Sequence, residues 1–191
     1  MEQSVYAKER KKSARRTAVY LVLALALLAV SPVEFVFAYR KGVVHNPWFR
    51  VFTSIGVVLL INQVNIFFAR RRAKRRMAAL GVDDMAIERF EREYATGRYE
   101  TVGPRNQSIL TDNWLLDSST GAVGLYPLRE VVRINPPMPK SFLGIPSGDG
   151  ARALELHFTD GGKINIMLSK RGAEQAVQAL AARVSQFTTN I

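Results

Sequence analysis

The sequence predicts an α+β protein in which a hairpin of two transmembrane helices precedes a strand-rich domain that ends in a helix. Three observations predict this order. Two long apolar runs occupy residues 18–39 and 48–69, and clusters of Lys and Arg flank them. Segments rich in β-formers, separated by turn residues, then fill 99–168, and an amphipathic stretch follows them.

The first apolar run, 18–39, has the length of a membrane span. A helix of this length reaches roughly 33 Å, which exceeds the roughly 30 Å thickness of a bilayer hydrocarbon core. Ser31, Pro32 and Glu34 interrupt its outer third, where membrane helices tolerate a kink. One alternative is a buried core helix of a soluble protein. Another is a signal peptide cleaved after Ala38, since a small residue there follows a basic and apolar stretch.

The second run, 48–69, opens with Trp48, a residue typical of the aromatic belt at a membrane interface. The link between the runs, 40–47, is so short that the two spans must form an antiparallel hairpin. Even if a signal peptide were cleaved, the second span and its basic flank would keep the C-terminal part in the cytoplasm.

The distribution of positive charge predicts the orientation of this hairpin. Six Lys and Arg residues lie in 1–17 and six in 70–76, against Arg40 and Lys41 in the link. Basic flanks stay on the cytoplasmic side. We therefore expect a multi-pass protein of the plasma (inner) membrane with both termini in the cytoplasm and the link outside.

The same distribution of charge favours lipid over nucleic acid as a partner. The whole chain has a formal net charge of +11, yet residues 77–191 hold 12 basic and 13 acidic side chains. A nucleic-acid-binding domain would carry its basic excess on a folded face. The cluster after the second span therefore either fixes topology or contacts anionic lipid headgroups. Its members are Arg70, Arg71, Arg72, Lys74, Arg75 and Arg76.

Polar residues inside the two spans are candidates for function. Glu34 and Arg50 should lie at similar depth near the outer surface, where they form a structural pair or serve transport. Asn62, Gln63 and Asn65 cluster in the inner half of the second span. Asn62 and Asn65 share a helix face, which suits hydrogen bonding to the first span or to another subunit.

A connector, 70–98, leads from the membrane to the strand-rich domain, 99–187, and 188–191 form a tail. Asp83 is a predicted N-cap of a helix that runs to Thr96. Asp160-Gly161 predicts a hairpin turn. The predicted strands are 99–103, 107–117, 122–126, 128–135, 152–159 and 163–168, with a loop over 136–150 and a final helix over 170–187.

The domain carries a resemblance to a known family. The strings Ile109-Leu110-Thr111-Asp112 and Tyr126-Pro127-Leu128-Arg129-Glu130-Val131, the Asp160-Gly161 hairpin and the closing helix resemble bacterial pleckstrin-homology-like (PH-like) membrane proteins of unknown function. The resemblance implies a seven-stranded, partly open β-barrel capped by the C-terminal helix. It implies no catalytic residues.

The sequence indicates binding and not catalysis. It has no cysteine and two histidines, of which His45 falls in the link and His157 beside Glu155 on a strand. We expect no catalytic residues, no metal site and no cofactor. The expected function is a non-enzymatic, membrane-anchored binding or scaffold protein that presents its PH-like domain to protein partners or to a second copy. The alternative is a small subunit of an oligomeric channel or transporter.

Overall fold

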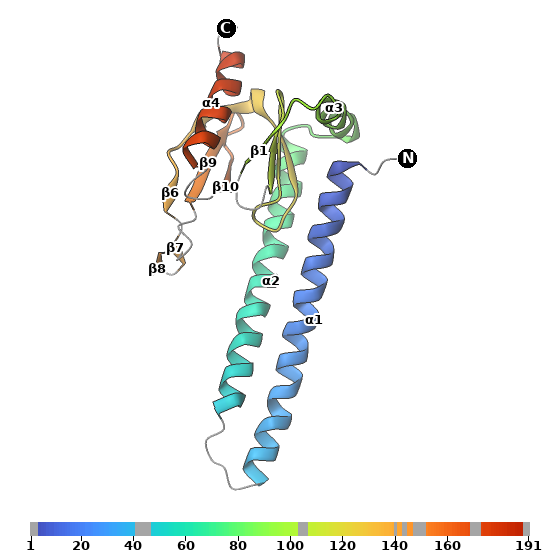
Figure 1. Ribbon diagram of the computed structural model, residues 1–191, viewed down its shortest axis with the longest axis vertical. Helices are drawn as coiled ribbons and strands as arrows, with labels where there is room; N and C mark the ends of the chain where they lie inside the picture. Colours follow the sequence, from blue (N-terminus) through green and yellow to red (C-terminus); the bar gives the residue numbers. More distant parts are fainter. Residues whose placement is uncertain are drawn as a thin grey trace.

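The computed structural model describes residues 4–40, 47–102, 107–139, 141–142, 145–146, 152–168 and 173–188. The chain has an α+β fold: two long apolar helices come first, then antiparallel sheets and a C-terminal helix. The helices form a long hairpin, and the sheets gather at one end of it (Figure 1). The start of the first long helix and the C-terminal helix lie at that same end of the hairpin (Figure 1).

The hairpin consists of α1 (Val5–Arg40) and α2 (Pro47–Ala79), of 36 and 33 residues. At 1.5 Å per residue they are about 54 Å and about 50 Å long. Both are long and apolar enough to cross a membrane, and each continues well past its apolar run. The helices approach closely at Gly56, where an added Cβ would meet Leu28 at 2.9 Å. Ala24, fully buried, lies at the same crossing.

The first sheet is a four-stranded antiparallel meander. The expected single strand over 107–117 is wrong, because the chain turns back on itself in its middle. The Thr111 amide donates to the Trp114 carbonyl at 2.9 Å, and the Trp114 amide donates to Thr111 Oγ1 at 3.1 Å. Asp112 and Asn113 favour such a turn. The strands are β1 (Glu100–Val102), β2 (Ser108–Leu110), β3 (Trp114–Asp117) and β4 (Gly124–Pro127).

The second sheet does not continue the first, and the sheets are not closed into a barrel. The expected partly open barrel is therefore wrong. After β4 the chain passes through the 3-10 turn η2 (Leu128–Glu130), and the next strand pairs instead with the long strand β9 (Arg152–Phe158). A short two-stranded sheet lies inside the expected loop over 136–150. The remaining strands are β5 (Val131–Ile134), β6 (Met138–Pro139), β7 (Ser141–Phe142), β8 (Ile145–Pro146), β9 (Arg152–Phe158) and β10 (Lys163–Leu168).

Two hydrophobic clusters cover the two faces of the first sheet. One cluster joins Leu115 and Tyr126 of the first sheet to β9, β10 and the final helix α4 (Ala173–Thr188). The other packs Trp114 and Leu116 on the end of α2 and on α3 (Asp84–Ala95). Every residue of β3 and β4 is buried as a result. This explains why Trp114 to Leu116 is uninterrupted by polar residues, as in strands covered on both faces.

Helix α3 fastens the domain to the start of α1. The Asp83 side chain accepts a hydrogen bond from the Ala86 amide at 2.8 Å, which confirms the predicted N-cap. Farther along α3, Glu91 accepts from the Val5 amide at 3.0 Å and the Tyr6 amide at 2.8 Å. A carboxylate from α3 therefore caps α1, whose first amides have no partner inside the helix.

We expect Glu91→Ala to release the first turns of α1. Loss of an N-cap costs about 1 kcal/mol, so amide hydrogen exchange should become severalfold faster in residues 5–9 and stay unchanged in α2. Glu88→Ala is the matched control, because Glu88 is exposed on the same helix. Equal exchange rates in the two variants would show that Glu91 does not cap α1.

Candidate functional site

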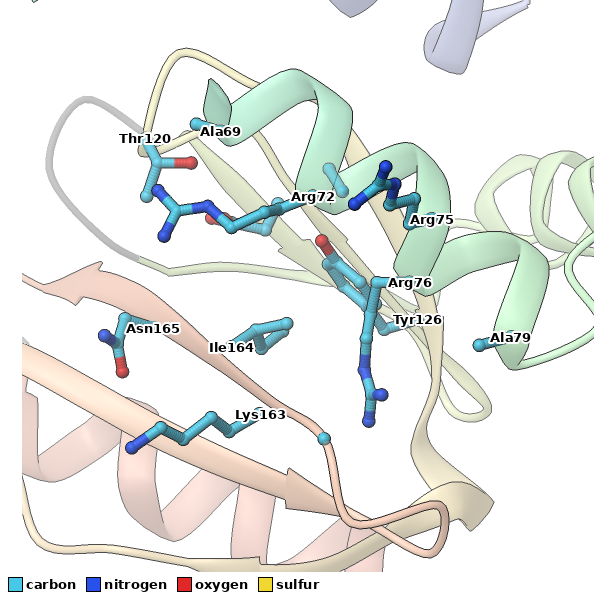
Figure 2. A pocket seen from close by; sticks show the side chains of 13 residues that line it. Ala69, Arg72, Arg75, Arg76, Ala79, Thr120, Tyr126, Lys163, Ile164 and Asn165 are labelled. Carbon is cyan, nitrogen blue, oxygen red and sulfur yellow. The ribbon is translucent and has the colours of Figure 1, made fainter. Parts of the chain in front are cut away.

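A cleft of about 570 Å³ lies where α2 meets the two sheets. One wall is the basic end of α2, and the opposite wall is the start of β10 (Figure 2). Tyr126 of β4 projects between them, toward α2 (Figure 2). Three arginines, Arg72, Arg75 and Arg76, line the α2 wall, and Lys163, Ile164 and Asn165 line the other.

The helical repeat explains the α2 wall. Residues three and four apart share a face of a helix, so Ala69, Arg72, Ala73 and Arg76 all border the cleft. The two alanines leave room beside the arginines. Among the described residues, neither Arg72 nor Arg75 makes a hydrogen bond or an ion pair. Two guanidinium groups are therefore available to a ligand.

Arg76 has a different role because its charge is already used. Its guanidinium forms a two-pronged ion pair with Asp160 and lies 4.7 Å from the centre of the Phe158 ring. Desolvation raises the pKa of Asp160, but the hydrogen bonds from Arg76 and the Gly162 amide outweigh it, so the pKa ends below its ordinary value. Arg76 thus clamps the turn between β9 and β10 onto α2.

The inner wall of the cleft holds a buried carboxyl group. Asp117 is 5% exposed, and its Oδ1 accepts from Ser108 Oγ at 2.7 Å and the Ser119 amide at 3.1 Å. Burial raises the pKa of Asp117 despite these hydrogen bonds. Burial also raises the pKa of Tyr126, and the nearby Asp117 adds to that shift. The cleft therefore combines a cationic wall with a hydrogen-bonded acid at its inner side.

A second hollow of about 420 Å³ adjoins the cleft toward the apolar run of α2. Arg72 and Arg75 line both spaces. The second hollow adds Arg71 and also Phe68 and Asn65, which belong to the apolar run. The two free arginines therefore stand between a space that faces the two sheets and a space that borders the apolar run of α2.

Arg70 joins the two long helices instead of facing the cleft. Its guanidinium donates to Ser13 Oγ at 2.9 Å and to Thr17 Oγ1 at 2.6 Å, both on α1. Ser13 Oγ in turn donates to the Gly121 carbonyl at 2.6 Å. Lys74 is exposed and lines neither hollow. The predicted basic cluster therefore divides into structural residues (Arg70 and Arg76), the free cleft residues Arg72 and Arg75, Arg71 in the second hollow alone, and one exposed lysine.

The predicted polar residues of the spans lie in different surroundings. Gln63 is 6% exposed, and its amide group has no hydrogen-bond partner among the described residues. Asn62, Asn65 and Arg50 are exposed on α2. Glu34 belongs to α1, but its side chain, and with it the expected pair with Arg50, falls outside the described residues.

His157 belongs to a polar cluster on the outer face of the second sheet. Its Nε2 lies 2.8 Å from Glu155 Oε1, and Asn135 Nδ2 donates to the same oxygen at 3.0 Å. Lys163 Nζ lies 2.9 Å from the other oxygen of Glu155. The hydrogen bond from Lys163, followed by that from His157, lowers the pKa of Glu155 to about 2.

This cluster predicts a pH dependence of stability. Because the folded pKa of Glu155 lies below its ordinary value of 4.5, its contribution is present above pH 4.5 and is lost as the pH falls toward 2. In chemical unfolding at a series of pH values, Glu155→Gln should be less stable than the native chain at pH 6, and the difference should shrink below pH 4.5. A difference that stays constant from pH 6 to pH 3 would contradict this assignment.

The chemistry available in the cleft is that of anion binding. Free guanidinium groups, an apolar surface at Ile164 and a phenol at Tyr126 border one space. Among the residues that the structure describes, no group of three His, Asp or Glu side chains could hold a metal ion.

Comparison with known proteins adds no assignment. No family model, curated protein or solved structure matches the chain. Its function must therefore be inferred from the residues and their geometry.

Proposed function

We propose that the chain is a non-enzymatic, membrane-anchored binding and scaffold protein. The hairpin of α1 and α2 crosses the plasma (inner) membrane with both termini in the cytoplasm. It presents a PH-like domain at the inner surface to protein partners or to a second copy. The start of α1, the final helix α4 and the two basic clusters lie at the same end of the hairpin (Figure 1), which supports this orientation.

The observation that carries the proposal is the fixed attachment of the domain to both helices. Glu91 of α3 caps α1, and the Arg76 clamp holds the turn after β9 against α2. Arg70, through Ser13, ties both helices to Gly121 between β3 and β4. A domain held at several points is presented in one orientation to the membrane surface. A flexible tether would not be attached in this way.

A cysteine placed after Ile191 tests the orientation, because the chain has no cysteine of its own. In intact cells this cysteine should resist an impermeant maleimide and react only after the membrane is opened. A second cysteine variant at Lys41, in the link, should react in intact cells. Labelling of the C-terminal cysteine from outside would overturn the proposed topology.

The partner is sought by crosslinking in the native membrane. A photoreactive residue at Val132, which is 58% exposed on β5, should capture a protein or a second copy of the chain. The same residue at Val22, on the membrane part of α1, serves as the comparison. Capture at Val22 alone would show that the domain does not present the binding surface.

One observation favours a channel or transporter subunit as the second candidate. Asn62 and Asn65 are exposed on a helix that is apolar enough to cross a membrane, and amides exposed to lipid gain from pairing with another helix. Replacing both by leucine should abolish function if the spans act as such a subunit, whereas deletion of 99–191 should abolish it if the domain is the binding module.

A further inference from the structure

We propose that the cleft and the adjoining hollow form one site for an anionic phospholipid of the inner leaflet, with its phosphate between Arg72 and Arg75. This inference rests on the proposed function for its orientation, since the cationic end of α2 must lie at the cytoplasmic surface. It assigns a ligand to residues that the scaffold role leaves unused.

The depth of the two arginines fits a lipid phosphate. Arg72 follows Ala69, the last residue of the apolar run, by about one helical turn, or about 5 Å along α2. The headgroup layer extends about 5–8 Å beyond each side of the hydrocarbon core. The Arg72 guanidinium therefore lies at the level of the phosphates. Arg75 follows Ala69 by about 9 Å, and its long side chain reaches back to the same level because helical side chains point toward the N-terminus of their helix.

The chemistry of the two side chains fits as well. Arginine offers planar, parallel N–H donors that match the oxygens of a phosphate. Arg76 is held by Asp160 and Lys163 by Glu155, so these two cations shape the walls. Arg72 and Arg75 alone among the cations of the cleft are without a carboxylate partner in the described residues.

The two hollows suit the two ends of a phospholipid. Phe68, beside both arginines, belongs to the apolar run and faces the acyl-chain region. On the other side, Ile164 and Tyr126 offer a surface for the glycerol and headgroup carbons. Asp117 places an acidic group at the inner wall, which disfavours a polyphosphate. The arrangement fits one phosphate on an amphiphile.

The test uses the full-length protein in nanodiscs. In discs of phosphatidylglycerol, compared with discs of phosphatidylcholine, amide exchange in residues 161–166 of the β9–β10 turn and β10 should be slower, and native mass spectrometry should find bound phosphatidylglycerol. Arg72→Gln with Arg75→Gln should weaken this binding about fivefold for each arginine removed. Lys11→Gln with Lys74→Gln is the matched control, because it removes the same charge from the basic clusters outside the cleft.

Retained binding in the control and loss in the arginine variant support the site. Arg72→Lys with Arg75→Lys keeps the charge and removes the paired donors, so intermediate binding is expected even if the glutamine variant is poorly folded. If Lys11→Gln with Lys74→Gln weakened lipid binding as much as Arg72→Gln with Arg75→Gln, the site would be overturned in favour of general attraction to the basic surface. Equal protection of 161–166 by soluble glycerol phosphate in phosphatidylcholine discs would overturn the lipid assignment.

These outcomes are separate from the topology test. Nanodiscs expose both faces of the membrane, so lipid binding there does not depend on orientation in the cell. A C-terminal cysteine labelled from outside would refute the proposed function even if the cleft bound lipid, whereas absence of binding with correct topology would refute the lipid site alone.

Discussion

Replacing Phe158 by alanine is expected to lower the free energy of unfolding of the α+β part by about 4 kcal/mol, the range of Phe→Ala changes in well-packed cores. Phe158 is 1% exposed at the end of β9. Its ring lies 5.8 Å from the ring of Tyr126 in the first sheet and under the Arg76 guanidinium of α2. One side chain therefore contacts all three parts that border the cleft, and its removal leaves a cavity at their junction.

Chemical unfolding of the full chain in detergent micelles measures this effect. Trp114, which is 8% exposed, reports on the first sheet when Trp48 is replaced by phenylalanine in every protein compared. Val132→Ala in the same background is the control, because Val132 is exposed and surface changes usually stay within about 0.5 kcal/mol. A loss below about 1 kcal/mol for Phe158→Ala would mean that the junction is not a packed core.

Features set by local sequence were predictable. The two apolar helices, the Asp83 cap and the turn at Asp160 and Gly161 each follow from residues close in the chain, and the structure shows all of them. Gly161 adopts a φ of 77°, which a glycine tolerates. Their signals are periodicity, capping chemistry and turn chemistry, none of which needs a distant partner.

Features set by distant partners were not predictable in the same way. Arg70 and Arg76 belong to one basic run, yet Arg70 contacts Ser13 and Arg76 contacts Asp160, far away in the sequence. Charge counting treats all six basic residues alike and cannot separate clamps from free cations. The barrel, which the family resemblance implied, is wrong for a related reason, because short matching strings of residues do not show which strand edges pair after η2.

The Arg76 clamp makes the second strong prediction. Arg76→Ala removes a two-pronged ion pair and a cation over the Phe158 ring. Asp160 is exposed to solvent, which screens its pair with Arg76. The expected loss of about 2 kcal/mol therefore comes mainly from the contact between the largely buried Arg76 guanidinium and the Phe158 ring. Amide exchange in the turn between β9 and β10 should become faster at the same time.

A substitution at Gly162 tests whether the contacts of the Arg76 side chain are the cause of this loss. A Cβ at Gly162 would overlap the Arg76 guanidinium, so Gly162→Ala must displace that side chain and break its pair with Asp160. Gly162→Ala alone should therefore cost nearly as much as Arg76→Ala. In the double variant the overlap is gone, so the second substitution should add almost nothing, a coupling of about 2 kcal/mol in a double-mutant cycle. Additive losses would mean that Gly162 is required for its backbone alone and that the clamp does not hold the domain to α2.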